Sequence, residues 1–194
     1  MALSVRSLFS AIKEARRRDP EKWSGLLLHF IGTDYASGSR AVKTIEPIAV
    51  EYGISDMVQE STERIPYLEG LRCLLDAHAL VVPCSDDPGY TPSKIYPYVL
   101  ARKPLLVIAH QKSPLVQVIK STNAGTLVTF TSGESIDDVA SRIDSEWLRP
   151  PTPPQTITSP GKFAPYSARE MTLRQCEVFD RVVAEGDTRS LEAA

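Results

Sequence analysis

Apolar residues along the chain follow two spacings, with short apolar runs separated by longer segments of helical periodicity. Runs that lack strict polar alternation are typical of parallel strands buried on both faces. The strands predicted in this way, the second of them the weakest, are residues 26–31, 57–61, 79–83, 104–109 and 126–130.

The segments between the strands repeat apolar residues every three or four positions, which predicts helices. The expected helices of this part are residues 3–18, 40–52, 66–76, 93–101, 113–120 and 135–147. Within residues 40–52, Pro47 predicts a kink, and Gly53 predicts the stop. Strands that alternate with helices predict an α/β fold, a Rossmann-like doubly wound parallel sheet of about five strands with helices on both faces.

The pattern changes after this body, and three parts are expected. Residues 1–148 form the Rossmann-like domain, residues 149–165 a proline-rich extended linker, and residues 166–194 a C-terminal helix and tail. The helix, expected at Ser167–Ala184, has a partial apolar face that should dock on the body or on a partner. The last ten residues are expected to fray. The apolar face contains Met171, Cys176, Phe179 and Val183.

Charge and cysteine content narrow the class of protein. The 22 basic and 24 acidic residues give a net charge of −2, which does not suggest a nucleic-acid or membrane-surface partner. Cys73, Cys84 and Cys176 stand far apart without metal-ligand spacing, which favours reduced thiols and a cytoplasmic protein. No segment is long and apolar enough to predict a membrane span, and the basic run at residues 16–18 complements a helix C-terminus.

The most informative stretch is residues 86–108, DDPGYTPSKIYPYVLARKPLLVI. Thr91 and Pro92 predict a helix start, since Thr caps free N–H groups and Pro suits the first helical position. Pro97 then falls where it would crowd the carbonyl of Ser93. Lys94 adds an ammonium to free backbone N–H groups and a helix dipole, which predicts an anion site, with phosphate the usual anion. The alternative is that Thr91 only caps the helix and Lys94 is solvated.

Ligands of open parallel sheets bind outside the carboxyl ends of the strands. This rule selects the loops at Gly32–Ser39, Glu60–Arg64, Cys84–Lys94 and His110–Ser113. The residues of the first of these, GTDYASGS, are small enough to bring the backbone close to a ligand. An ordinary loop without a ligand is an equally supported alternative.

Three segments resemble a known family. HFIGTDY, DAHALVVPCSDDPGYTPSKIYPYVLARKPLLVI and NAGTLVTF follow the order and spacing of the C-terminal, donor-binding half of GT-B glycosyltransferases, in particular the retaining, nucleotide-sugar-dependent family four (glycosyl transferases group 1). The similarity covers about residues 3–147. Its most specific part is S-K-x-x-x-Y-x-x-A-x-K-P, which begins at Ser93.

The resemblance implies a site for a nucleotide-diphosphate sugar, used as donor substrate, with no metal and no further cofactor. It names no catalytic residue. The implied donor contacts are Gly32 and Thr33 near the donor, Ser93 and Lys94 on its diphosphate or sugar, and Gly89, Tyr90 and Thr91 in the loop above it.

The chain also departs from the family pattern. Pro97 stands where the family places a Glu that holds the ribose hydroxyls, and Gly89 stands at the other acidic position. Asp86 and Asp87 are nearby carboxylates out of register. The family's central strand and its acceptor-binding domain have no counterpart in this chain, so a fragment, or a domain that works with a second polypeptide, is expected. The first and third strands could then meet in the order 2-1-3-4-5.

Other chemistries have weaker support. His110 lies at a strand end with Lys112 and Ser113 and could contact the donor sugar, the alternative being a solvated loop histidine. Cys84 ends a strand without a histidine assigned beside it, which argues against a thiol nucleophile. The glycine-rich signatures of dinucleotide and P-loop sites do not occur, and Asp34 and Asp86 are poorly spaced for a phospho-acceptor pair.

We therefore expect the donor-binding domain of a glycosyltransferase that transfers a sugar to an unknown acceptor and forms part of the complete enzyme. An acceptor-binding domain would be supplied separately, and self-association of this chain is left open. The alternative is a non-catalytic Rossmann-like binding or interaction domain that has lost nucleotide-sugar binding, as Pro97 suggests.

Overall fold

The computed structural model describes residues 2–34, 36, 40–150 and 160–192 of the 194-residue chain. The chain divides into two compact units, residues 1–157 and 158–194, and each is described by itself. The division falls inside the predicted linker at 149–165, of which residues 151–159 lie outside the described part.

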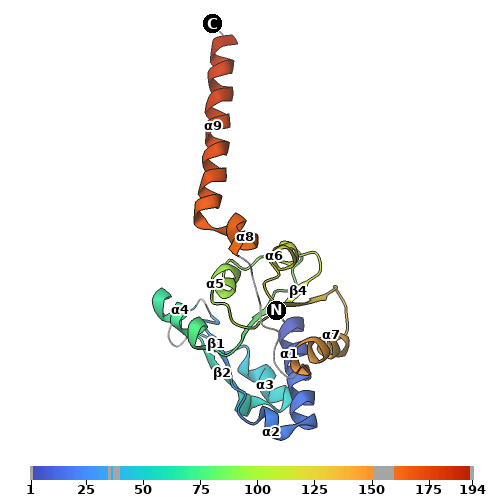
Figure 1. Ribbon diagram of the computed structural model, residues 1–194. Coiled ribbons are helices and arrows are strands. Elements are labelled where there is room, and N and C mark those ends of the chain that lie inside the picture. Colours follow the sequence, from blue (N-terminus) through green and yellow to red (C-terminus); the bar gives the residue numbers. More distant parts are fainter. Residues whose placement is uncertain (1, 35, 37–39, 151–159, 193–194) are drawn as a thin grey trace. The chain divides into compact units, whose positions relative to one another are not determined.

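The first unit contains parallel strands connected by helices, which confirms the Rossmann-like α/β fold predicted from the sequence (Figure 1). Strand β4 is buried along its whole length, as expected for a central strand covered on both faces. The strands are β1 (Leu28–Ile31), β2 (Val58–Ser61), β3 (Leu80–Pro83), β4 (Leu105–His110) and β5 (Thr126–Phe130).

The strands form two sheets, one of β1 and β2 and one ordered β3-β4-β5. Within the described residues β1 and β3 do not pair, so the order 2-1-3-4-5 is not formed as one hydrogen-bonded sheet. Side-chain packing therefore has to join the two sheets.

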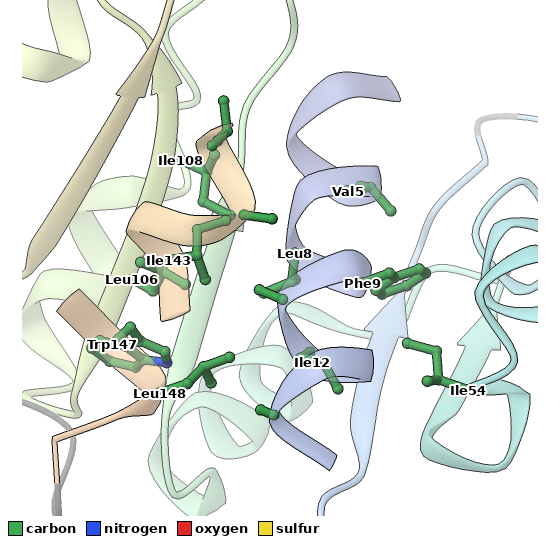
Figure 2. Packing of buried hydrophobic residues seen from close by; sticks show 14 of the residues in the cluster. Val5, Leu8, Phe9, Ile12, Ile54, Leu106, Ile108, Ile143, Trp147 and Leu148 are labelled. Atoms are coloured by element: carbon green, nitrogen blue, oxygen red, sulfur yellow. The ribbon is translucent and has the colours of Figure 1, made fainter. Parts of the chain in front are cut away.

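Helix α1 (Ala2–Arg18) supplies this packing. On one side of α1, Phe9 meets Phe30 of β1 edge to face, with the ring centroids 6.0 Å apart. On the other side, Leu8 turns toward Leu106 of β4 and Ile143 (Figure 2). Because the buried positions of α1 contact both sheets, the helix joins them into a single hydrophobic core.

Helices cover both faces of the three-stranded sheet. Leu106 and Ile108 of β4 face the α1 core, so Leu105, Val107 and Ala109 alternate to the opposite face, where α6 packs. The helical segments of this unit besides α1 are α2 (Pro20–Trp23), α3 (Glu46–Tyr52), η2 (Ser55–Met57), α4 (Tyr67–Asp76), α5 (Ile95–Leu100), α6 (Pro114–Thr122), α7 (Ile136–Ile143) and the π-helical η3 (Asp144–Leu148).

The sequence predicted a helix over residues 40–52 with a kink at Pro47. The first half of that prediction is wrong. Helix α3 begins at Glu46, so Pro47 lies in its first turn. Backbone N–H groups of a first turn have no intrahelical acceptor, so the missing donor of Pro47 costs nothing there. Gly53 ends the helix in the left-handed conformation, as predicted (φ 71°).

The basic run at the end of α1 is neutralised within the chain. Arg16 pairs with Asp56 at 2.8 Å and Arg17 with Glu14 at 2.9 Å. Arg18 donates to both carboxylate oxygens of Asp144, at 3.0 and 2.7 Å. An open groove between the C-terminal ends of α1 and α3 is therefore lined by arginines that already have carboxylate partners.

The second unit contains α8 (Pro160–Phe163), η4 (Ala164–Tyr166) and the 25-residue helix α9 (Ala168–Glu192) (Figure 1). One expectation is wrong here: the described end of the linker is helical. Helix α9 also continues to Glu192, past the end predicted at Ala184. Residues 193 and 194 lie outside the described part.

Gly125 gives a direct test of the packing between β4 and β5. A Cβ at this position would overlap the carbonyl oxygen of Leu105 and lie 3.0 Å from the Leu105 Cβ. Gly125→Ala should therefore lower the free energy of unfolding by about 1–3 kcal/mol, measured by urea denaturation. Gly25→Ala is the control, because its Cβ would meet nothing within 4 Å. Equal stability of the two variants would contradict this account of the β4–β5 contact.

Candidate functional site

The carboxyl ends of β3, β4 and β5 lie along one edge of a sheet, because all three strands are parallel. The loop 84–94, the short loop after His110 and the loop after Phe130 leave from this edge. This is the position at which parallel α/β sheets bind ligands.

The first half of loop 84–94 is held by its own residues. Asp87 accepts the backbone N–H of Gly89 on its carboxylate at 2.9 Å and that of Tyr90 on its carbonyl at 3.1 Å. Ser113 donates its hydroxyl to the Tyr90 carbonyl at 2.7 Å and accepts the N–H of Leu115 at the start of α6. The amides of Gly89 and Tyr90 are therefore already used, although both residues lie in the predicted loop.

The second half of the loop differs from the prediction in where the helix begins. Helix α5 begins at Ile95 and not at the Thr91–Pro92 pair, and Lys94 occupies the position before it. Pro97 is therefore the third residue of a first turn, where a missing N–H is tolerated, and is not an interior proline. A turn precedes the helix, closed by the N–H of Ile95 on the Pro92 carbonyl at 3.2 Å.

Ser93 and Lys94 form the open part of this turn. Both are exposed, and among the described residues neither their backbone N–H groups nor the Lys94 ammonium has a hydrogen-bond or carboxylate partner. Two amides and one ammonium at the carboxyl end of β3 can together receive an anion.

Cys84, the residue directly after β3, is buried, and the charge of the Lys94 ammonium influences its thiol. Burial raises the pKa of the Cys84 thiol to about 12, and the positive charge of Lys94 opposes that rise. The thiol is consequently protonated near neutral pH, which makes Cys84 a poor nucleophile.

His110 is buried at the end of β4, so the alternative of a solvated loop histidine is wrong. Its Nδ1 accepts the backbone N–H of Lys112 at 3.2 Å, which places the ring proton on Nε2, 3.2 Å from the Ser132 hydroxyl. The ring also meets Phe130 edge to face. With both ring nitrogens engaged, His110 positions two loops and has no nitrogen left for a sugar.

The loop after β1 is bonded to a carboxylate of β2, that of Glu60, which the sequence analysis placed in the selected loop Glu60–Arg64 but did not name as a donor contact. Glu60 of β2 is buried, with 3% of its surface exposed. Thr33 donates its hydroxyl to Glu60 at 2.6 Å, and the backbone N–H groups of Thr44, Ile45 and Glu46 donate to the same carboxylate. Glu60 thus fills the anion position at the start of α3. The sequence contains one signal for the burial of Glu60. It lies two residues after the inward-facing Val58, and residues two apart in a strand face the same side.

Two further contacts close this loop. Asp34 accepts the backbone N–H groups of Ala36 and Val42 at 3.0 and 2.8 Å. Gly32, with φ at 70°, donates its N–H to the Ser61 carbonyl at 2.8 Å. The remaining predicted loop positions, 35 and 37–39, lie outside the described residues.

The predicted donor contacts therefore fall into two groups. Gly32 and Thr33 follow the two-stranded sheet, whereas Ser93 and Lys94 follow the three-stranded sheet. Thr91 is exposed and does not cap α5, whose N-cap position is Lys94. Among the described residues, Thr91, Ser93 and Lys94 are the members of the predicted set that remain open to a ligand.

Searches against protein-family models, curated proteins and solved structures gave no match to this chain. In the part of the chain that the structure describes, no three His, Cys, Asp or Glu side chains gather as metal ligands. None of the described helices has both the length and the apolar character that a membrane crossing requires.

The carboxylate of Glu60 gives a stability prediction that depends on pH. Burial raises its pKa, but the hydrogen bonds from Thr33 and the backbone outweigh burial and hold the pKa below the ordinary value of 4.5. A lowered folded-state pKa stabilises the fold above pH 4.5, and that stabilisation is lost as the pH falls through the folded-state value.

Glu60→Gln should lower the free energy of unfolding at pH 7 by about 1–3 kcal/mol, because one acceptor oxygen is replaced by an amide donor. It should also flatten the change in stability between about pH 5 and pH 3. Urea denaturation at a series of pH values measures both effects. Glu63→Gln, at an exposed position, is the control. A pH profile that is the same in Glu60→Gln and in the unmodified chain would refute the assignment.

Proposed function

We propose that this chain binds the diphosphate of a nucleotide sugar at Ser93 and Lys94, as the donor-binding domain of a glycosyltransferase. The observation that carries the proposal is the pair of amides and the ammonium at the carboxyl end of β3, which have no partner in the part of the chain that the structure describes. The Rossmann-like parallel fold and the spacing that begins at Ser93 support the same class.

In this proposal the chemistry is transfer of a sugar to an acceptor held by another domain. As the bond from the sugar to the diphosphate breaks, negative charge grows on the leaving diphosphate. The Lys94 ammonium and the amides of Ser93 and Lys94 stabilise that charge, and they are in place before the reaction begins. No residue of this chain is assigned as a general base.

In this proposal fewer residues contact the donor than the family resemblance implies. Gly89 and Tyr90 shape the loop through their bonds to Asp87 and Ser113, and Thr33 is bonded to Glu60. Pro97 offers no carboxylate to ribose hydroxyls. The diphosphate is therefore the part of the donor that this chain would bind most directly.

A second candidate function is a non-catalytic binding or interaction domain. It is favoured by Glu60, whose carboxylate already fills the anion position at the start of α3. Titration calorimetry of the full chain with UDP, GDP and their sugars separates the two candidates. Binding with micromolar to millimolar affinity supports the donor-binding domain. No heat with any nucleotide, also when an acceptor-binding domain is added, supports the interaction domain.

Lys94→Ala tests the residue that carries the proposal. Removing a charge-assisted contact should weaken the binding of UDP or GDP by about 1–3 kcal/mol, which is about fivefold to 150-fold. Lys120→Ala is the matched control, because Lys120 is an exposed lysine in the last turn of α6, away from the start of that helix at the carboxyl edge. Equal affinity of Lys94→Ala and the unmodified chain would remove Lys94 from the site.

A further inference from the structure

Helix α9 presents an apolar surface to solvent. From Met171 to Ala184 every side chain is exposed. A long helix in water is stabilised mainly by packing of an amphipathic face, and exposed apolar stripes mark interaction sites. The large exposed apolar residues of α9 are Met171, Leu173, Val178, Phe179, Val182 and Val183.

All of these residues except Leu173 lie on one side of the helix. At 3.6 residues per turn, they fall within an arc of about 160°, together with Cys176 and Gln175. The opposite side carries Glu170, Glu177 and Arg181. We call the apolar arc the α9 stripe.

Two opposite charges border the α9 stripe along the same edge. Arg169 and Asp180 are eleven residues apart and point within about 20° of one another around the helix axis. When two copies of a helix pack antiparallel about a two-fold axis, the same edge of each copy meets. An axis between Arg174 and Gln175 sets Arg169 of one copy opposite Asp180 of the other, and the symmetry repeats the pair.

The same register matches the apolar residues. It sets Met171 opposite Val178 of the second copy, Ala168 close to Val182, and Gln175 beside its own symmetry mate near the axis. In a parallel pair the edge with Arg169 and Asp180 would instead face the edge with Met171 and Val178, so neither charge would meet its opposite. Charge complementarity therefore selects a second copy of this chain in the antiparallel orientation.

We propose that the α9 stripe is a self-association surface, through which two copies of this chain form an antiparallel, two-fold symmetric helix pair bordered by two Arg169–Asp180 ion pairs. This is independent of the nucleotide-sugar proposal, because it uses no residue of the carboxyl-end loops.

Sedimentation equilibrium of the full chain measures the association. The unmodified chain should dimerise in the micromolar range. Phe179→Asp should weaken dimerisation by at least about tenfold while circular dichroism shows unchanged helix content, because Phe179 is exposed in the single copy. A chain that remains monomeric up to about 100 μM overturns the proposal, as does a dimer that Phe179→Asp leaves intact.

A charge exchange tests the partner and its orientation. Arg169→Asp and Asp180→Arg should each weaken the dimer by about threefold to thirtyfold, since each change places like charges at two symmetric sites. The double variant Arg169→Asp/Asp180→Arg should restore the affinity to within about threefold. Arg181→Asp, on the opposite side, is the control and should have little effect. Failure of the double variant to restore affinity overturns the antiparallel register.

Cross-linking gives an independent readout of direction. In a Cys73→Ser/Cys176→Ser background, a mixture of Ala168→Cys and Val182→Cys chains should form disulfide-linked dimers under mild oxidation, and Val182→Cys alone should not. In a parallel pair each residue would lie beside its own copy, so Val182→Cys alone would cross-link and the mixture would give only linked dimers of like chains. That outcome would overturn the proposal.

Discussion

The first unit depends on one helix that packs against two sheets. Strands β1 and β2 have no hydrogen-bonded connection to β3, β4 and β5 among the described residues, so α1 holds the halves together. Phe9 and Leu8 are neighbours in sequence and point to different sheets, which requires α1 to be apolar on a wide arc. The Ser4 hydroxyl adds a direct bond to the Cys84 carbonyl at 2.7 Å and fixes α1 to the exit of β3.

Carboxylates of this unit accept hydrogen bonds from many of the loop amides, so only the remaining amides are free for a ligand. Glu60 and Asp34 satisfy the amides of the loop after β1, and Asp87 satisfies those of Gly89 and Tyr90. Each of these acids is an internal substitute for an external anion, because it supplies acceptor oxygens to donors that would otherwise need a ligand or water. The turn at Ser93 and Lys94 has no such acid among its described neighbours, which is why it stands out at the carboxyl edge.

The strands were the most predictable part of the fold. The last one was predicted at its observed bounds, Thr126–Phe130, because a buried parallel strand needs a short apolar run. The starts of α3 and α5 were not predicted, since Pro47 and Pro97 look the same in sequence whether they lie in a first turn or in a helix interior. At α3, the distant carboxylate of Glu60 helps to fix the start, and local patterns do not contain such a contact. The division into two sheets was not predicted either, because whether β1 pairs with β3 is decided by segments far apart in the sequence.

Pro97 affects what the loop can offer to a ligand, but it does not disturb the fold. Pro97 does not strain α5, because its ring occupies a first-turn position, so its presence is no sign of a damaged fold. Its consequence is chemical: it provides neither an N–H nor a carboxylate to a ligand. His110 shows the converse case, a residue type suited to chemistry whose two nitrogens serve the loops around it. The anion binding proposed for this edge therefore depends on amides and one ammonium, and such groups select charge more strongly than they select the identity of a base or a sugar.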